Sequence, residues 1–122
     1  MNLNDQLKKH RITLTKKYGQ NFISDPSLLE RIASVCDWQD DDVALEIGPG
    51  AGTLTRAIAA HADRMLAIEI DKRLAPLLEE SLSGCDNVKL IFGDALKSDL
   101  DALVRDELNH DGDYKLVANL PY

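Results

Sequence analysis

Short apolar runs alternate along the chain with segments whose apolar residues recur at helical spacing. The apolar runs, each of a length typical of a buried strand, are residues 43–47, 65–70, 88–92 and 115–119. The predicted helices are residues 26–36, 53–61, 72–82 and 99–108. Because strands and helices alternate, we predict βαβ units, a parallel sheet and a doubly wound α/β fold. Right-handed crossovers then place successive helices on the faces of the sheet.

The helix boundaries come from residues with restricted backbones. Ser24 or Asp25 can cap the first helix with Pro26 at its first helical position, and the polar run 37–42 ends it. The apolar positions of this helix are Leu28, Leu29, Ile32, Val35 and Cys36. Pro76 either interrupts or starts the helix predicted over residues 72–82.

The last predicted strand, residues 115–119, has only one neighbour in a sheet of four parallel strands. Its outer edge is therefore open, although natural sheets usually cover or blunt such edges. The sequence also ends on a motif, at Tyr122, rather than on a tail. We expect the chain to be a piece of a longer protein.

Composition is that of one globular domain or part of one, with 122 residues of which 44% are hydrophobic and 29% charged. No apolar run has the length of a membrane helix, and the first residues lack the layout of a signal peptide. Cys36 and Cys85 form no disulfide framework and have no metal-ligand spacing. We therefore expect a reduced, cytoplasmic protein without a metal or a membrane.

The net charge of −7 disfavours a nucleic-acid partner, because phosphate contacts need lysine and arginine. The distribution changes this picture. Residues 1–17 carry five basic side chains and one acidic one, whereas the remaining residues carry nine and twenty. A basic arm ahead of an acidic body is compatible with RNA contact through the arm. A solvated, disordered N-terminus explains the same charges.

A glycine-rich turn, residues 46–52, lies between the first predicted strand and the helix that follows it. Gly48, Gly50 and Gly52 let the backbone turn sharply and approach a ligand closely. Such a turn can also be a plain connection. Glu69, at the end of the second strand, stands where a carboxylate accepts hydrogen bonds from the two ribose hydroxyls of a nucleoside cofactor.

Two cofactors compete for this turn, a dinucleotide and S-adenosylmethionine. A dinucleotide site has G-x-G-x-x-G, whereas here the glycines are spaced G-x-G-x-G with Glu46 two residues before the first. A carboxylate there repels a pyrophosphate but suits the cationic amino-acid end of S-adenosylmethionine, directly or through water. After the third strand Asp94 can accept the adenine amine, while Ala95 and Leu96 can pack on the ring.

Simpler roles stay open for these acids, because Glu46 could cap or pair and Asp94 could be an N-cap. Their placement together with Glu69 at three successive strand ends is typical of ligand sites in open α/β sheets. The pattern therefore favours the methyl donor, and an NAD-type dehydrogenase half is the alternative.

The final tetrapeptide, Asn119-Leu120-Pro121-Tyr122, follows the fourth strand at the same end of the sheet. The Asn119 side chain and the Leu120 carbonyl can hold the N–H groups of an adenine amine, whose lone pair is delocalised into the ring. Pro121 fixes the local backbone, and Tyr122 offers a face for an unstacked base. Positioning then supplies most of the catalysis. As a loop without function, these residues could also form an Asn-Pro type turn.

Four motifs together resemble the ribosomal RNA adenine dimethyltransferases, KsgA-like enzymes with the Erm methyltransferases as cousins. They are Tyr18-Gly19-Gln20-Asn21-Phe22, residues 46–55, Gly93-Asp94-Ala95 and Asn119-Leu120-Pro121-Tyr122. The resemblance covers residues 16–122 and implies the N-terminal part of a Rossmann-like class I methyltransferase that uses S-adenosylmethionine. The sequence of residues 46–50, Glu-Ile-Gly-Pro-Gly, resembles that of KsgA more than that of Erm enzymes.

The resemblance also implies roles for single residues. Asn21 and Ile23 would cover the cofactor, and Gly48 would contact its methionine part. Glu69 would hold the ribose, Asp94 the adenine, and Asn119 the target amine and the methionine end. We therefore divide the chain into a basic arm, residues 1–24, which contributes the Gly19–Phe22 segment, and a cofactor-binding half, residues 25–122.

The implied reaction converts two adjacent adenines near the 3′ end of small-subunit rRNA, in an immature 30S-type particle, to N6,N6-dimethyladenosine. Family members continue past this tetrapeptide with three more strands and a small helical domain, which this sequence lacks. We therefore expect the 122-residue piece to fold but to methylate no ribosome. The alternatives are an Erm-like large-subunit enzyme, a DNA amino-methyltransferase, and an RNA-binding assembly factor without turnover.

Overall fold

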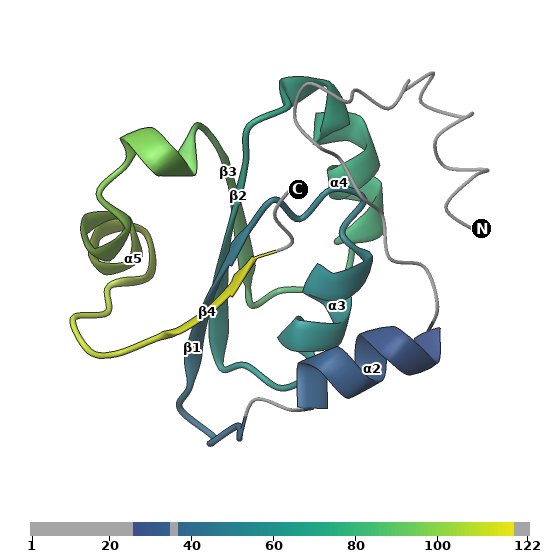
Figure 1. Ribbon diagram of the computed structural model, residues 1–122, viewed down its shortest axis with the longest axis horizontal. Helices are drawn as coiled ribbons and strands as arrows, with labels where there is room; N and C mark the ends of the chain where they lie inside the picture. The colour runs from purple at the N-terminus through teal and green to yellow at the C-terminus, as the bar shows by residue number, and fades with distance from the viewer. Residues whose placement is uncertain (1–25, 35–36, 119–122) are drawn as a thin grey trace.

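In the part of the chain that the structure describes, four parallel strands form a central sheet, and helices cover both of its faces (Figure 1). The computed structural model describes residues 26–34 and 37–118. Its strands are β1 (Val43–Ile47), β2 (Arg64–Glu69), β3 (Val88–Phe92) and β4 (Lys115–Ala118), in the order β3-β2-β1-β4. The structure thus confirms the parallel α/β sheet that the alternation of elements predicts.

The order in which the chain adds strands to the sheet reverses at β1. The chain moves outward from β1 to β2 and β3, and then returns to place β4 on the other side of β1. Ile47 at the end of β1 is in register with Ile68 of β2 and with Ala118 of β4. A reversal of this kind is a topological switch point, and in open α/β sheets ligands bind beside the carboxyl ends of the strands there.

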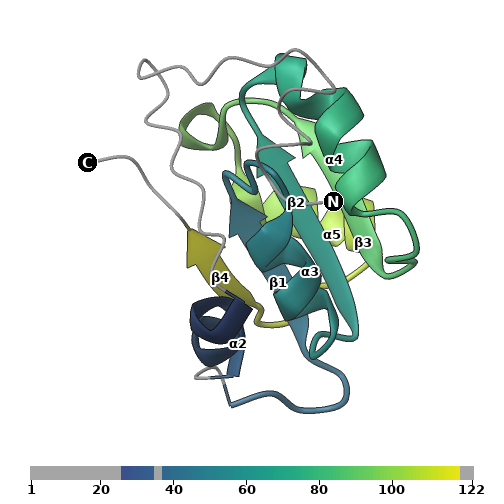
Figure 2. The same cartoon turned by 90° about the vertical axis from the view of Figure 1, so that its right-hand side faces the viewer.

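Of the described α-helices, three lie on one face of the sheet and one lies on the other. α2 (Pro26–Ser34), α3 (Thr53–Ala59) and α4 (Ala75–Ser81) share a face, while α5 (Leu100–Leu108) covers the opposite one (Figure 1). Figure 2 shows α3 and α4 in front of the sheet and α5 behind it. No helix among the described residues is long and apolar enough to cross a membrane.

Alternate residues of β1 face the two helix layers, which places one acidic side chain beneath α3. Ala44 is buried in the core cluster that contains Ile58 of α3, and Leu45 is buried in the cluster that contains Val104 of α5. Because side chains alternate along a strand, Glu46 faces the same side as Ala44. The sheet therefore directs the Glu46 carboxyl group toward α3 at the carboxyl end of β1.

The helix predicted over residues 72–82 consists of two pieces. A 3₁₀ turn, η2 (Lys72–Leu74), precedes α4, and Pro76 lies in the first turn of α4, where its missing N–H is tolerated. Asp71 caps η2 by accepting a hydrogen bond from the Arg73 N–H. Of the two predicted roles for Pro76, the structure therefore supports that of a helix start.

Other boundaries differ from the predictions by one or two residues, and one short element was not predicted. α3 ends at Ala59 rather than at residue 61, and β2 occupies 64–69 rather than 65–70. A second 3₁₀ turn, η3 (Ala95–Lys97), follows β3. The predicted cap residues Ser24 and Asp25, the helix positions 35–36 and the strand position 119 lie outside the described residues.

Among the described residues, the outer edge of the last strand is open, as the sequence predicts. Within residues 26–34 and 37–118, β4 pairs with β1 alone. Leu116 of β4 is 54% exposed on the face that α5 covers elsewhere.

Candidate functional site

The carboxyl ends of β1, β2 and β3 carry the predicted cofactor-binding residues to one edge of the sheet. The glycine loop, residues 48–52, follows β1, Glu69 ends β2, and Asp94 lies two residues after β3. Because the strands are parallel, these three groups lie at the same end of the sheet. The sequence prediction of one shared edge is therefore correct for the residues that the structure describes.

The glycine loop has backbone conformations that few other residues adopt. Gly48, Gly50 and Gly52 have φ angles of 75°, 60° and 84°. A Cβ atom at residue 52 would lie 2.8 Å from the Ser81 hydroxyl of α4. Glycine at this position thus permits both the left-handed turn and the close packing of α3 against α4.

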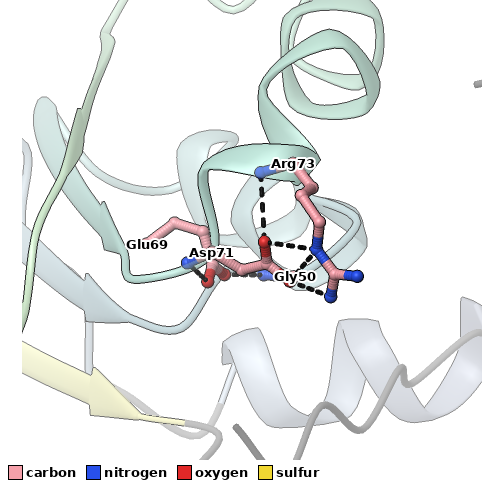
Figure 3. Close-up of polar contacts among 4 residues, drawn as sticks. All are labelled: Gly50, Glu69, Asp71 and Arg73. Carbon is pink, nitrogen blue, oxygen red and sulfur yellow. Dashed lines mark hydrogen bonds and ion pairs between the residues drawn. The ribbon is translucent and has the colours of Figure 1, made fainter. Parts of the chain in front are cut away.

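The loop is bound to β2 by two hydrogen bonds. The Gly48 N–H donates to the Ile68 carbonyl at 2.9 Å, and the Gly50 N–H donates to the Glu69 carboxylate at 3.1 Å. The other Glu69 oxygen accepts from the Asp71 N–H at 2.8 Å (Figure 3). The Glu69 side chain therefore joins the turn after β1 to the turn after β2.

Glu69 is only 3% exposed, and burial raises the pKa of its carboxyl group. Each oxygen still has lone pairs beyond the one that a backbone N–H uses, so the group can accept further hydrogen bonds from hydroxyls. A carboxylate that is fixed by two backbone donors is a rigid acceptor. It is well suited to bind a pair of hydroxyl groups such as those of a ribose.

Asp71 and Arg73 form a polar contact at this edge that the sequence reasoning missed. Asp71 is buried and pairs with the Arg73 guanidinium at 2.6 Å (Figure 3). The signal in the sequence is an aspartate directly before a helical turn whose second residue is an arginine, which is a typical capping pattern. This pair fixes the backbone that donates to Glu69.

Glu46 does not reach the surface of the site. It is 1% exposed and accepts a hydrogen bond from the Thr55 hydroxyl in the first turn of α3. Burial, partly offset by that hydrogen bond, raises the pKa of Glu46 to about 7. The structure therefore places Glu46 beneath the glycine loop, paired with Thr55, which was one of its two predicted roles. Sequence reasoning missed Thr55, because only the folded chain brings it to Glu46.

Asp94 caps η3, as one of its predicted roles requires, by accepting a hydrogen bond from the Leu96 N–H at 3.0 Å. Ala95 packs partly buried against the core cluster under α5. Leu96, in contrast, is 95% exposed. Leu96 is therefore the apolar side chain at the end of β3 that is free to pack on a planar ring.

Several predicted site residues lie outside the described residues. They are Asn21, Ile23, Asn119, Leu120, Pro121 and Tyr122. Their roles stay predictions, although the strand that leads to the last four ends beside Ile47, at the start of the glycine loop.

The side chains at this edge of the sheet include several acidic groups. Within residues 26–34 and 37–118 no group of three or more histidine, cysteine or acidic side chains could hold a metal ion. Two buried carboxyl groups, Glu46 and Glu69, lie beneath and beside the glycine loop. This arrangement disfavours a pyrophosphate and suits a ligand with hydroxyl, amine and cationic groups.

Comparison with known proteins points to one family. Residues 11–122 match the family described as ribosomal RNA adenine dimethylase. The ribosomal RNA small subunit methyltransferase A of Levilactobacillus brevis is 47% identical over 116 residues, which are 95% of this chain and 39% of that protein. The chain thus spans about two fifths of the length of the curated relatives that it matches.

Solved structures agree with this relationship. The crystal structure of the 23S rRNA methyltransferase ErmE has a TM-score of 0.69 and 34% identity, over 84% of this chain and 38% of that one. A dimethyladenosine transferase from Plasmodium falciparum has a TM-score of 0.64 and 26% identity, over 84% and 34%. An RNA methyltransferase from Salinibacter ruber in complex with S-adenosyl-L-homocysteine has a TM-score of 0.56 and 25% identity, over 66% and 55%. The sheet, the glycine loop and the match over residues 11–122 lead to one conclusion: the chain belongs to the ribosomal RNA adenine dimethylase family.

Proposed function

We propose that the complete protein transfers methyl groups from S-adenosylmethionine to N6 of two adjacent adenosines near the 3′ end of small-subunit rRNA. The observation that carries this proposal is the hydrogen bond from the Gly50 N–H to the buried Glu69 carboxylate. It fixes the Glu69 carboxylate, our proposed ribose-binding group, against a glycine loop at the switch point of the sheet. Family membership supports adenine dimethylation as the chemistry.

The described residues fit S-adenosylmethionine. Glu69 can accept hydrogen bonds from the ribose hydroxyls, Asp94 can accept from the adenine amine, and the exposed Leu96 can pack on the adenine ring. The glycines of the loop have no Cβ atom to obstruct a ligand that approaches the backbone, so we expect the methionine end to lie there. When bound, S-adenosylmethionine supplies a methyl group on a sulfonium, which an amine nitrogen can attack. The S-adenosyl-L-homocysteine complex of the Salinibacter ruber enzyme supports this choice.

Asn119, Leu120, Pro121 and Tyr122 are proposed to position the target amine. The Asn119 side chain and the Leu120 carbonyl would accept hydrogen bonds from the amine, which directs its lone pair away from the adenine ring. Pro121 would fix that carbonyl, and Tyr122 would support the unstacked base. The methylated nitrogen loses its proton readily, so no strong base is required. Asn21 and Ile23 are proposed to cover the cofactor.

The relatives favour the small ribosomal subunit as the substrate. The curated relative at 47% identity is named a small subunit methyltransferase, whereas the structural neighbour named for 23S rRNA is 34% identical. The basic residues in 1–17 would contact RNA phosphates, since the rest of the chain is acidic. A ribosomal substrate supports the proposed cytoplasmic location. Large-subunit methylation is the second candidate, because of the likeness to ErmE.

Calorimetry on the complete protein tests the choice of cofactor. We expect S-adenosylhomocysteine to bind and NAD to show no heat of binding, because the carboxylates at this edge repel a pyrophosphate. Binding of NAD alone would instead place the protein among the dinucleotide-binding enzymes.

A further inference from the structure

A hydrogen bond closes the glycine loop at its base. Glu46 is the penultimate residue of β1, and Thr55 is the third residue of α3. The Thr55 hydroxyl donates to the Glu46 carboxyl group, and both side chains are fully or almost fully buried. This contact joins the residues on either side of the loop, so it fixes the direction in which α3 leaves the loop relative to β1.

The other contacts of the loop do not replace this one. The N–H groups of Gly48 and Gly50 bond to β2, and they fix the loop relative to the neighbouring strand. Only the contact between Glu46 and Thr55, among the hydrogen bonds found in the described residues, joins the side chains of β1 and α3. The hydroxyl of a threonine in a helix commonly donates to the carbonyl four residues earlier. The Thr55 hydroxyl donates instead to the Glu46 side chain of β1.

Packing does not explain an acid at this position. The register partners of Glu46 are Ala67 on β2 and Val117 on β4, both apolar. The charged group that acts on it is the Glu69 carboxylate, which is of like sign. Among the described residues no basic side chain pairs with Glu46, and the nearby Arg56 guanidinium of α3 donates to the Ser81 carbonyl. An apolar pair would fill the space without burying an acid.

We propose that Glu46 and Thr55 are positioning residues, whose hydrogen bond holds the glycine loop in the conformation that receives the methionine end of the cofactor. Neither side chain touches the cofactor in this account, because both are buried. The inference rests on the proposed function and sharpens it. It replaces a direct role for the Glu46 charge with an indirect role that needs only a hydrogen-bond acceptor.

The test compares four variants of the complete protein by calorimetry with S-adenosylhomocysteine, at a temperature where each is folded by circular dichroism. Thr55→Val keeps the shape of the side chain and removes the donor, so we expect the dissociation constant to rise about tenfold. Thr55→Ser keeps the donor and should restore most of the affinity. Glu46→Gln keeps an acceptor oxygen and removes the charge, and its affinity should stay within about threefold of wild type.

Ile58→Val is the matched control, because Ile58 is buried on the same helix, in the core cluster that contains Ala44 and Met65, and takes no part in the hydrogen bond between Glu46 and Thr55. It should lower the denaturation midpoint and leave the affinity unchanged, which separates positioning from a general loss of stability.

Two results would overturn the inference. Thr55→Val that binds as tightly as wild type would show that the contact does not shape the loop. Glu46→Gln that loses affinity as strongly as Thr55→Val would show that the charge acts directly, and this variant decides the question alone if Thr55→Val does not fold. A wild-type protein that binds no S-adenosylhomocysteine would instead refute the proposed function itself.

Discussion

The Glu69 carboxylate at the end of β2 accepts a hydrogen bond from the backbone N–H of Gly50, nineteen residues earlier in the chain. Its second oxygen accepts from the Asp71 N–H, so one buried side chain holds the two turns that border the site (Figure 3). The carboxylate is thus oriented before any ligand arrives. Such preorganisation reduces the ordering cost of binding.

Glu69→Gln should weaken cofactor binding strongly. An amide has one acceptor oxygen, so its NH₂ group faces one of the two backbone N–H donors and that hydrogen bond is lost. We expect the dissociation constant for S-adenosylhomocysteine, measured by calorimetry, to rise at least about tenfold. Glu79→Gln, on the exposed side of α4, is the control and should bind as wild type. Equal affinities in both variants would exclude Glu69 from the site.

Gly52→Ala should destabilise the protein more than Gly84→Ala. Both glycines have positive φ angles, 84° and 87°, so alanine pays a backbone cost of about 1 kcal/mol or more at either position. Only at residue 52 does the new Cβ also meet Ser81, while nothing lies within 4 Å at residue 84. We expect urea denaturation to show about 1–3 kcal/mol of additional loss for Gly52→Ala.

Ser81→Ala in the Gly52→Ala background supplies the internal check, because it removes the hydroxyl that the new Cβ would meet. Part of the additional loss should return. If the two glycine variants lose the same stability, the packing of α3 against α4 is not tight at this point.

Stability should fall as pH rises through the range in which Glu46 ionises. Its pKa is raised by burial from 4.5 to about 7, so between these values the folded state binds more protons than the unfolded state. The free energy of unfolding therefore decreases with rising pH across this range and is level above it, as far as Glu46 is concerned. Across the whole range, ionisation of Glu46 lowers the free energy of unfolding by about 3 kcal/mol.

Glu46→Gln carries no titrating group at this position, so its unfolding free energy should exceed that of wild type at pH 8 and lose most of this pH dependence. Denaturant titrations at pH 5 and pH 8 measure both quantities, with the exposed Glu79→Gln expected to follow wild type. If Glu46→Gln is less stable than wild type at pH 8, then burial of the ionised Glu46 carboxylate does not destabilise the folded protein, which would contradict the account.

Leu96→Ala should weaken cofactor binding without affecting stability. The side chain is 95% exposed, so its removal costs the folded protein little, whereas packing on an adenine ring would bury it on binding. The loss of about 1 kcal/mol of apolar burial corresponds to about a fivefold rise in the dissociation constant. Leu116→Ala, which shortens another exposed leucine on β4, should leave the affinity unchanged. The same calorimetric titration measures both, and no change for Leu96→Ala would mean that the adenine packs elsewhere.

Most of the fold can be predicted from the sequence, because apolar runs and glycines determine where strands lie and end through short-range effects. Residues 43–47 and 88–92 form strands over the ranges that their apolar pattern indicates, and Gly48 marks the end of the first. Pro76 was expected to interrupt or start the helix over residues 72–82. The 3₁₀ turn η2 ahead of α4 was not predicted, because it depends on the cap that the Asp71 side chain provides. Helix periodicity carries no signal for a 3₁₀ turn of three residues.

The sequence predicted which candidate site residues lie at the ends of strands. It predicted less well which side chains these residues contact. The positions of Glu69 and Asp94 follow from strand ends, which a sequence can locate. That Glu46 faces α3 and meets Thr55 depends on which face of the sheet α3 covers, and this is a property of the tertiary structure. Leu96 was expected to pack on a ring together with Ala95, and only the structure shows that Ala95 is partly used by the core.

The most direct test of the account is the identity of the methylated nucleoside. Small and large ribosomal particles that lack the modification are incubated with the complete protein and methyl-labelled S-adenosylmethionine. The labelled rRNA nucleosides are then identified by mass spectrometry. The account predicts label in N6,N6-dimethyladenosine of the small particle, and a far lower yield with Asn119→Ala at unchanged affinity for S-adenosylhomocysteine. Label confined to the large particle, or carried by a nucleoside other than an N6-methylated adenosine, would contradict it.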